Sequence, residues 1–399
     1  MLVLHVRSAV SAHGRGGLQP LLLLHRCITT ELGRWQRRCD RLTQLQRRIR
    51  FPALQTITVG GETYQLPLRT VHPTRAPSRE ELEYLVGFFD GNGYVTMQST
   101  GQVRLAVSRN VDSADVLLRF RSLLGGGVGF CRAATGTSKA ALRWEVTGSK
   151  LTEAAAALGT IPSMKQEQLL IAAKGNVAEP DRPLVGKELK MLKKKEHVPH
   201  NPPECSWPYF AGFFDAEGCI RVRSLNAGLQ LSMEQMNPCV PTHLLHFLRE
   251  KDLRTWSLHH RAKCSSLVCT NTPECKKTLE LLLENGLLVK QQQAELALSL
   301  TGENHLDVRG AISALNGLQG RYQRLDTDGI GRARQIQSLQ WRVRYISGQE
   351  HAAMLSRIEE LRAAHKLKTL ISRSQLLRRD MRRSMREGGQ VVSITTRSS

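Results

Sequence analysis

Alternation of apolar and polar residues marks two groups of short segments in the chain. The first group is "YVTMQS", "QVRLAVSR" and "ALRWEVTG", and the second is "CIRVRS", "GLQLSMEQ" and "SLVCTNT". A period of two predicts strands that bury one face. Helical stretches accompany them: "SADVLLRFRSLL" and "KQEQLLIAAK", then "THLLHFLREK" and "KQQQAELALSL". With a helix in front of each group, the predicted order is αββαββα in both.

The two opening helices carry nearly the same sequence. "LVGFFDGNGYV" occupies residues 85–95 and "FAGFFDAEGCI" residues 210–220, a spacing of 125. Ser78 and Glu81 form a capping-box pattern at the start of the first helix. Gly93 and Gly218 are expected to end the two helices. "SMKQEQLLIA" and "LVKQQQAELA" repeat at the same spacing of 125, so the chain contains an internal duplication.

This pattern predicts five regions. They are a basic N-terminal extension at 1–77, a first repeat at 78–175, a Lys- and Pro-rich linker at 176–203, a second repeat at 204–304 and a basic helical extension at 305–399. In the last region, apolar positions recur at helical spacing among dense arginines, which predicts a basic amphipathic helix. Those positions are Ile358, Leu361, Leu370, Leu377, Met381 and Met385. The lysine run at 193–195 fits either a solvated surface or contacts with phosphates.

Each opening helix has a strip of small residues. The strip consists of Gly87 and Gly91 in the first copy and of Gly212 and Ala216 in the second. Small residues at a spacing of four let two helices approach until their backbones nearly touch. We therefore expect the two helices to pack against each other about a pseudo-twofold axis.

The formal net charge of +22 indicates a polyanionic partner. No run of eighteen apolar residues is present, so no membrane span is expected, and nucleic acid is favoured over a membrane surface. The first fifty residues contain ten arginines and two acids. Such a segment is typical of a transit peptide for the mitochondrion or plastid, and it also fits a basic arm that holds DNA, with the nucleus as the alternative location.

The nine cysteines form no zinc-binding pattern. Cys264, Cys269 and Cys275 are the closest cluster, and their spacings do not fit a zinc knuckle or ribbon. Free thiols or small core residues are the simpler interpretation.

The residue before each terminal glycine carries the candidate chemistry. It is Glu217 in one copy and Asn92 in the other. Two carboxylates held together at helix C-termini would repel each other and the helix dipoles. Divalent cations between them would offset that repulsion. Mg²⁺ ions held in this way can activate water and stabilise the leaving oxygen of a phosphodiester.

The two motifs resemble those of the LAGLIDADG homing endonucleases, in the single-chain form with two motifs. "AGFFDAEG" is similar to the second half of that consensus, and "KQEQ" and "KQQQ" are similar to the Lys-Gln-x-Gln segment of the family; the resemblance spans about 78–300. It implies an α+β fold in which two pseudo-symmetric αββαββα units form an antiparallel β saddle. It further implies a monomer that cleaves double-stranded DNA at a long asymmetric site, using Mg²⁺ or another divalent cation.

The resemblance also implies roles for individual residues. Glu217 would bind metal, with Asn92 at the matching position; Lys165 and Lys290 would flank the scissile phosphates; and Gln235, with its counterpart Arg109, would position water. Asp90 and Asp215 would be structural residues at the helix ends. Strand residues that could contact DNA bases or phosphates are Arg104, Arg143, Arg221, Arg223 and Gln230.

Asn92 departs from the family pattern, because an amide brings no negative charge to a metal. Three outcomes follow from this change. The protein nicks one strand, or it cuts both strands slowly with Asn92 as a weak ligand, or it binds DNA or intron RNA without cutting, as a maturase does. A structural protein that depends on its basic tails is a further alternative.

Overall fold

The computed structural model describes residues 19–73, 75–223, 227–315 and 326–392, with side chains from residue 30 onward. The chain divides into two compact units. One consists of residues 52–134 and 138–317 and contains both repeats, so we call it the double-repeat unit. The other consists of residues 1–51, 135–137 and 318–399, and we call it the helical unit. Most of the two predicted extensions, residues 1–51 and 318–399, thus belongs to one unit, and residues 52–77 and 305–317 belong to the other.

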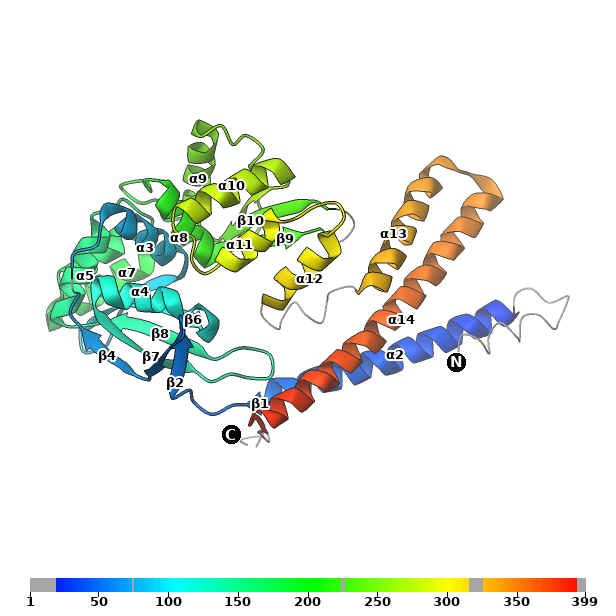
Figure 1. Ribbon diagram of the computed structural model, residues 1–399, viewed down its shortest axis with the longest axis horizontal. Helices are drawn as coiled ribbons and strands as arrows, with labels where there is room; N and C mark the ends of the chain where they lie inside the picture. The colour runs from blue at the N-terminus through cyan, green and yellow to red at the C-terminus, as the bar shows by residue number, and fades with distance from the viewer. Residues whose placement is uncertain (1–18, 74, 224–226, 316–325, 393–399) are drawn as a thin grey trace. The chain divides into compact units, whose positions relative to one another are not determined.

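Both repeats have the predicted order of elements, with one unpredicted helix inserted before the predicted last helix (Figure 1). The first contains α3 (Arg79–Asn92), β5 (Gly93–Met97), β6 (Val103–Asn110), α4 (Ala114–Leu124), β7 (Gly126–Arg132), β8 (Ala141–Val146), α5 (Ser149–Gly159) and α6 (Gln166–Ala173). The second contains α8 (Trp207–Glu217), β9 (Gly218–Val222), β10 (Leu229–Gln235), α9 (Cys239–Glu250), β11 (Ser257–His260), β12 (Ser265–Cys269), α10 (Thr272–Glu284) and α11 (Gln291–Leu298). The predicted duplication is confirmed.

The two sheets have matching strand orders. The second sheet runs β11-β12-β10-β9, and the first runs β7-β8-β6-β5 with the extra strand β4 (Leu68–Val71) at its outer edge. All pairings are antiparallel. The predicted fold class, α+β with two pseudo-symmetric αββαββα units and the motif helices at the centre, is confirmed.

The strands bury one face, as their alternation predicts. In the first sheet Val95, Leu105, Val107 and Trp144 point into the core and are fully buried. In the second, Leu229, Leu231 and Leu267 do the same. Helices cover these inner faces, so the outer faces are left without a covering helix of their own repeat.

Two strands lacked a signal in the sequence. β7 has the sequence "GGVGFCR" and β11 is only "SLHH". Glycine favours neither strand nor helix, and four residues are too few to show a period. Pairing with β8 and β12 specifies both strands instead. β2 (Thr56–Val59) and β3 (Glu62–Gln65), which form a separate hairpin, were also not predicted.

The connection between the repeats is partly helical. It contains α7 (Arg182–Met191), whose Leu189 is buried together with the following Leu192. Lys193 and Lys195 of the lysine run donate to the backbone carbonyls of Val95 and Ala262. Helix α12 (His305–Leu315) also belongs to the double-repeat unit, because its Val308 and Ile312 are part of the same core.

The helical unit consists of three long helices. They are α2 (Gln19–Arg48), α13 (Thr327–Arg342) and α14 (Gly348–Arg386), and α14 packs on both of the others (Figure 1). A short antiparallel pair, β1 (Ile49–Arg50) with β13 (Gln390–Val391), joins the end of α2 to the end of α14. The predicted basic C-terminal helix is confirmed as α14. Of the first fifty residues, which were predicted to be a transit peptide or a basic arm, residues 1–18 lie outside the described residues, and most of the remainder forms α2.

None of the described helices is long and apolar enough to cross a membrane.

Candidate nucleic-acid cleavage site at the centre of the double-repeat unit

The two motif helices, α3 and α8, touch through their backbones. A Cβ atom added at Gly87 would lie 2.0 Å from the carbonyl oxygen of Tyr209, and one added at Gly212 would lie 2.0 Å from that of Tyr84. At Gly91 it would lie 2.4 Å from the Cβ of Ala216. No side chain fits at the first two positions, so the strip of small residues determines how closely the two repeats can pack.

The capping box of α3 is confirmed. Ser78 Oγ accepts from the Glu81 N–H, and the Glu81 carboxylate accepts from the Ser78 N–H. At the other end, Gly93 and Gly218 end their helices as predicted, but neither adopts the positive φ that glycine commonly supplies at a helix end. Their backbones are extended, with φ of −79° and −66°. A Cβ would instead collide with the ring of Phe89 or Phe214.

Asp90 links α3 to the segment before α6 and to the other motif helix. Its fully buried carboxylate accepts the backbone N–H groups of Met164 and Lys165, each at 3.0 Å, and the Tyr209 hydroxyl at 2.7 Å. Burial raises the pKa of Asp90, and the charge of Lys165 and these hydrogen bonds oppose that shift.

Asp215 repeats this arrangement in the second copy. Its carboxylate accepts the N–H groups of Leu288 and Lys290 at 2.7 and 2.8 Å, and the Tyr84 hydroxyl at 2.7 Å. The two tyrosines were not predicted. They could have been found, because they lie at the same repeat spacing of 125 as the motifs.

Lys165 and Lys290 lie at the ends of the motif helices. Lys165 Nζ donates to the carbonyl oxygens of Phe89 and Gly93 at 2.8 and 2.6 Å. Lys290 Nζ donates to the carbonyl oxygen of Asp215. Burial lowers the pKa of each lysine to about 8, and nearby carboxylates, including Glu217, oppose the shift.

Arg109 and Gln235 reach across the pseudo-twofold axis. Arg109, on β6 of the first repeat, donates to the carbonyl oxygens of Asp215 and Ala216 on α8, both at 3.4 Å. Gln235, on β10 of the second repeat, donates to the carbonyl oxygen of Asp90 on α3 at 3.4 Å. Burial lowers the pKa of Arg109, and the charges of Asp215 and Glu217 oppose the shift.

Glu217, the last residue of α8, lies within electrostatic range of three cations. Its charge raises the pKa of Arg109, Lys165 and Lys290. Burial raises the pKa of Glu217 itself, opposed by those same three groups. The fold thus gathers Glu217, Lys290 and Arg109 at the end of α8. The matching groups at the end of α3 are Asn92, Lys165 and Gln235.

The donor set at this centre suits one divalent cation better than two. Glu217 supplies one carboxylate, and the Nδ2 atom of Asn92 is buried without a hydrogen-bond partner in the described structure. Turned over, that amide would present its oxygen at the same place. Most carbonyl oxygens at the helix ends already accept from Lys165, Lys290, Arg109 or Gln235. No group of three or more His, Cys, Asp or Glu side chains suited to a metal occurs among the described residues.

A groove of about 640 Å³ opens beside Lys290 and Arg109. It is also lined by Lys139, which the sequence analysis did not identify. Lys139 pairs with Asp112, another residue of the groove. Lys139 lies two residues before β8, and Lys263 lies two residues before β12, so the repeat could have pointed to it.

The outer face of the first sheet carries Arg104 and Arg143, as predicted from alternation. Both are half-buried, and both pair with Glu145 on the same face, at 3.4 and 3.8 Å. Their strand neighbours on this face include Ala106, Gly127 and Gly129. The first sheet therefore offers few unpaired donors to a polyanion.

The outer face of the second sheet carries Arg221, paired in register with Gln230. Arg223 lies just beyond β9, where its N–H donates to the carbonyl oxygen of Gly228. The same face also carries the exposed Glu234, which pairs with Arg261 at 3.1 Å. The predicted DNA-contacting residues thus lie on the uncovered faces, where acids are interspersed with them.

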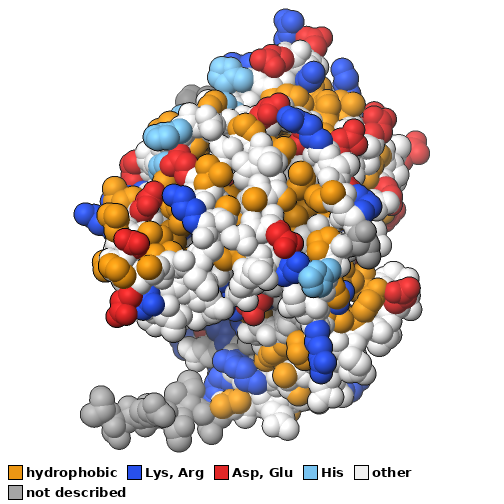
Figure 2. All heavy atoms as spheres, turned by 90° about the vertical axis from the view of Figure 1, so that its left-hand side faces the viewer, with side chains coloured by type: hydrophobic (Ala, Val, Ile, Leu, Met, Phe, Trp, Pro, Cys, Tyr) orange, Lys and Arg blue, Asp and Glu red, His pale blue; other side chains and the backbone are white. Residues whose placement is uncertain are grey.

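The positive charge of the chain is concentrated in the helical unit. That unit holds 27 of the 57 Lys and Arg residues and 9 of the 35 Asp and Glu residues, a formal net charge of +18. The double-repeat unit, with the remaining 30 basic and 26 acidic residues, has a net charge of only +4. Figure 2 shows acidic and basic side chains intermixed on one face of the molecule. Both extensions that were predicted to be basic contribute to this charge.

The fold defines a class of protein with a duplicated αββαββα unit and a central helix pair. No protein-family model and no curated protein matches the sequence. Among solved structures, the chain is similar to the LAGLIDADG meganuclease I-CpaMI bound to uncleaved DNA, with 11% identity over 58% of this chain and 98% of that one, at a TM-score of 0.43. It is similar to the LAGLIDADG meganuclease I-AabMI bound to uncleaved DNA, with 16% identity over 59% of this chain and 99% of that one, at a TM-score of 0.44. It is also similar to the LAGLIDADG homing endonuclease I-GzeII in complex with its DNA target, with 12% identity over 62% of this chain and 98% of that one, at a TM-score of 0.43.

Proposed function

We propose that this protein is a DNA endonuclease of the LAGLIDADG homing type that cuts one strand of a double-stranded site. The observation that carries the proposal is the placement of one carboxylate, Glu217, beside Lys290 and Arg109 at the junction of two duplicated motif helices. We also propose that the protein acts as a monomer, because the junction between the two repeats lies within one chain. We further propose that it is located in the mitochondrion or plastid.

Two unequal half-sites support cleavage of a single strand. One half-site has Glu217, Lys290 and Arg109, and the other has Asn92, Lys165 and Gln235. Only the first contains a carboxylate, the ligand that a hard cation prefers. A Mg²⁺ ion held there would lower the pKa of its bound water and stabilise the leaving oxygen.

The side chains around Glu217 have separate tasks in this proposal. The ammonium of Lys290 and the guanidinium of Arg109 neutralise the scissile phosphate, and Arg109 can also donate two parallel hydrogen bonds to it. Their present hydrogen bonds to the carbonyls of Asp215 and Ala216 hold both groups at the end of α8. In the other half-site, Lys165 can bind a phosphate, but Asn92 provides no negative charge for a cation.

A second candidate function is nucleic-acid binding without cleavage, by a degenerate DNA-binding protein or an intron-RNA maturase. Two observations favour it: the amide at Asn92 and the near-neutral charge of the double-repeat unit. A polyanion would then be held mainly by the helical unit.

Strand-resolved cleavage tests the proposal. A randomised duplex pool is enriched for binding in Ca²⁺, Mg²⁺ is then added, and breaks in each strand are scored separately. The native protein is expected to cut one strand, Glu217→Gln to bind equally well without cutting, and Asn92→Asp to cut both. Glu234→Gln removes an exposed acid from the second sheet and is expected to cut like the native protein.

Each result has a definite meaning for the proposal. Binding with no Mg²⁺-dependent break from either the native protein or Asn92→Asp would overturn cleavage and support the second candidate. Cleavage that survives Glu217→Gln would show that the reacting centre lies elsewhere.

A further inference from the structure

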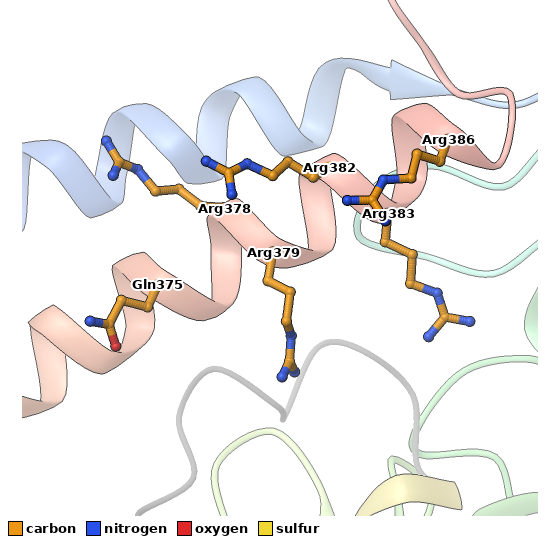
Figure 3. A pocket seen from close by; sticks show the side chains of 6 residues that line it. All are labelled: Gln375, Arg378, Arg379, Arg382, Arg383 and Arg386. Carbon is orange, nitrogen blue, oxygen red and sulfur yellow. The ribbon is translucent and has the colours of Figure 1, made fainter.

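The last turns of α14 carry a dense cluster of arginines. Residues 371–386 contain six arginines and one acid, Asp380, which is buried. Five of the arginines line an open groove of about 370 Å³ together with Gln375. We call these five the arginine face: Arg378, Arg379, Arg382, Arg383 and Arg386 (Figure 3).

Among the described residues, most of the arginine face has no acidic partner. Arg383 pairs with Glu387 at 2.7 Å, and Arg379 lies 3.7 Å from Asp380. Arg378, Arg382 and Arg386 form no ion pair with any described residue, and all three side chains are exposed. They follow one another at a spacing of four, so they lie along one side of the helix. Unpaired like charges on one stripe repel each other unless an anion lies between them.

The packing of the helical unit holds this stripe on a rigid support. Leu370, Ser374 and Leu377 in the same part of α14 are buried. The Cys39 thiol of α2 donates to the carbonyl oxygen of Leu370 at 3.2 Å. The β1–β13 pair then fixes the ends of the two helices together, just beyond Arg386. Charges held in place before binding lose less entropy when they engage a partner.

The chemistry of the arginine face fits phosphates and not bases. Guanidinium groups donate in pairs to phosphate oxygens and accept nothing. None of the groove-lining residues is aromatic, so the groove offers no ring on which an unpaired base could stack. A double-stranded backbone is therefore the better partner.

We propose that the arginine face binds the phosphate backbone of double-stranded DNA, independently of its sequence, in addition to the contacts made by the double-repeat unit. The choice of DNA over RNA rests on the proposed function. When one chain binds a duplex at two places, the first contact raises the effective concentration of the duplex for the second. Arg378 and Arg386 are eight residues apart, about 12 Å along the helix. Measured along the duplex axis, that length corresponds to about three or four phosphates of one strand, at roughly 3.4 Å of axial rise each.

The test is the salt dependence of binding by the full-length protein to a random-sequence DNA duplex that it does not cut. The variant is Arg378→Gln with Arg382→Gln. The matched control is Arg357→Gln with Arg362→Gln on the same helix, because those arginines already pair with Glu360 and Glu359 at 2.9 and 2.6 Å. Both double variants lower the net charge equally, and thermal unfolding verifies that both are folded.

The first variant is expected to reduce the slope of log K against log salt by about 2, because each phosphate contact contributes about 0.9. The control should change it by less than about 0.5. Equal decreases of the slope in both variants would mean that overall charge, and not the arginine face, accounts for the effect. An unchanged slope in the first variant would show that the arginine face does not contact DNA. The same measurements are made with an RNA duplex of the same sequence. Tighter binding of the RNA, together with a slope change seen only with RNA, would overturn the assignment to DNA. Cleavage plays no part in this assay, so its outcome is separate from that of the proposed endonuclease.

Discussion

Tyr209 on the second motif helix donates a hydrogen bond to Asp90 on the first, while Tyr84 on the first donates to Asp215 on the second. Each buried carboxylate is thus completed by a hydroxyl from the other repeat. The exchange joins the repeats at the same place where Gly87 and Gly212 let their backbones meet. The position of Glu217 relative to the two lysines depends on this joint.

Removing one of these hydroxyls should weaken the junction. We expect Tyr209→Phe to lower the free energy of unfolding by about 1–3 kcal/mol, because a buried carboxylate loses one of its three donors. Urea denaturation measures the change. Tyr64→Phe is the control: its hydroxyl donates to exposed Glu62, and no measurable change is expected. Equal stability of Tyr209→Phe and the native protein would mean that the backbone N–H groups alone satisfy Asp90.

A methyl group at the helix crossing should be more damaging. In Gly212→Ala the new Cβ would lie 2.0 Å from the Tyr84 carbonyl oxygen, so the helices must separate. We expect a loss of about 3 kcal/mol or more, at the upper end of overpacking effects. Gly310→Ala in α12, where nothing lies within 4 Å of the added atom, should instead stabilise by about 0.5–1 kcal/mol. A tolerated Gly212→Ala would contradict the close packing of α3 and α8.

Lys165 and Lys290 should titrate near pH 8 in the folded protein. Burial disfavours their charged forms and lowers each pKa to about 8, whereas Glu217 raises both. In Glu217→Gln both lysine pKa values should therefore fall further. In the control Glu234→Gln they should equal those of the native protein. NMR of lysine labelled at Cε measures these titrations. A solvated lysine has a pKa of roughly 10.4. If both lysines of the native protein had pKa values near that, the burial of the two groups would be contradicted.

The same shifts give stability a definite pH dependence. Above about pH 8 the folded protein has released these two protons, while the unfolded chain holds them to roughly pH 10. The contribution of the two lysines to the free energy of unfolding should therefore rise between those values. Comparison with Lys165→Met and Lys290→Met, measured from pH 7 to 10, isolates it. A contribution that falls over this range would contradict the lowered pKa values.

The two units should respond separately to a cavity in the helical one. Leu377 on α14 is fully buried, so Leu377→Ala is expected to destabilise the helical unit by about 2–5 kcal/mol. Calorimetry should show one unfolding transition moved to lower temperature and the other unchanged. Leu355→Ala, on the same helix but exposed, is the control. A single transition that shifts as a whole would show that the two units unfold together.

Periodicity and duplication in the sequence determined much of the fold. Alternation at Val95, Leu105 and Leu231 predicted which strand faces are buried, because a strand turns every second side chain inward. The repeat spacing of 125 predicted the paired helices and brought Lys165 and Lys290 to matching positions. It did not reveal β7 or β11, which contain too few patterned residues and depend on their neighbours for pairing.

Only the tertiary structure decided how the matched residues combine. The sequence aligned Arg109 with Gln235, but each side chain contacts the helix of the opposite repeat, a relation that no local pattern contains. Both ends of the sequence were predicted to be basic, but only the packing of α2 against α14 joins them into one unit, which holds +18 of the total charge of +22. Local spacing determines secondary structure because its causes lie within a few residues. Which groups meet at the site depends on contacts between residues more than 70 positions apart, and those contacts form only when the chain folds.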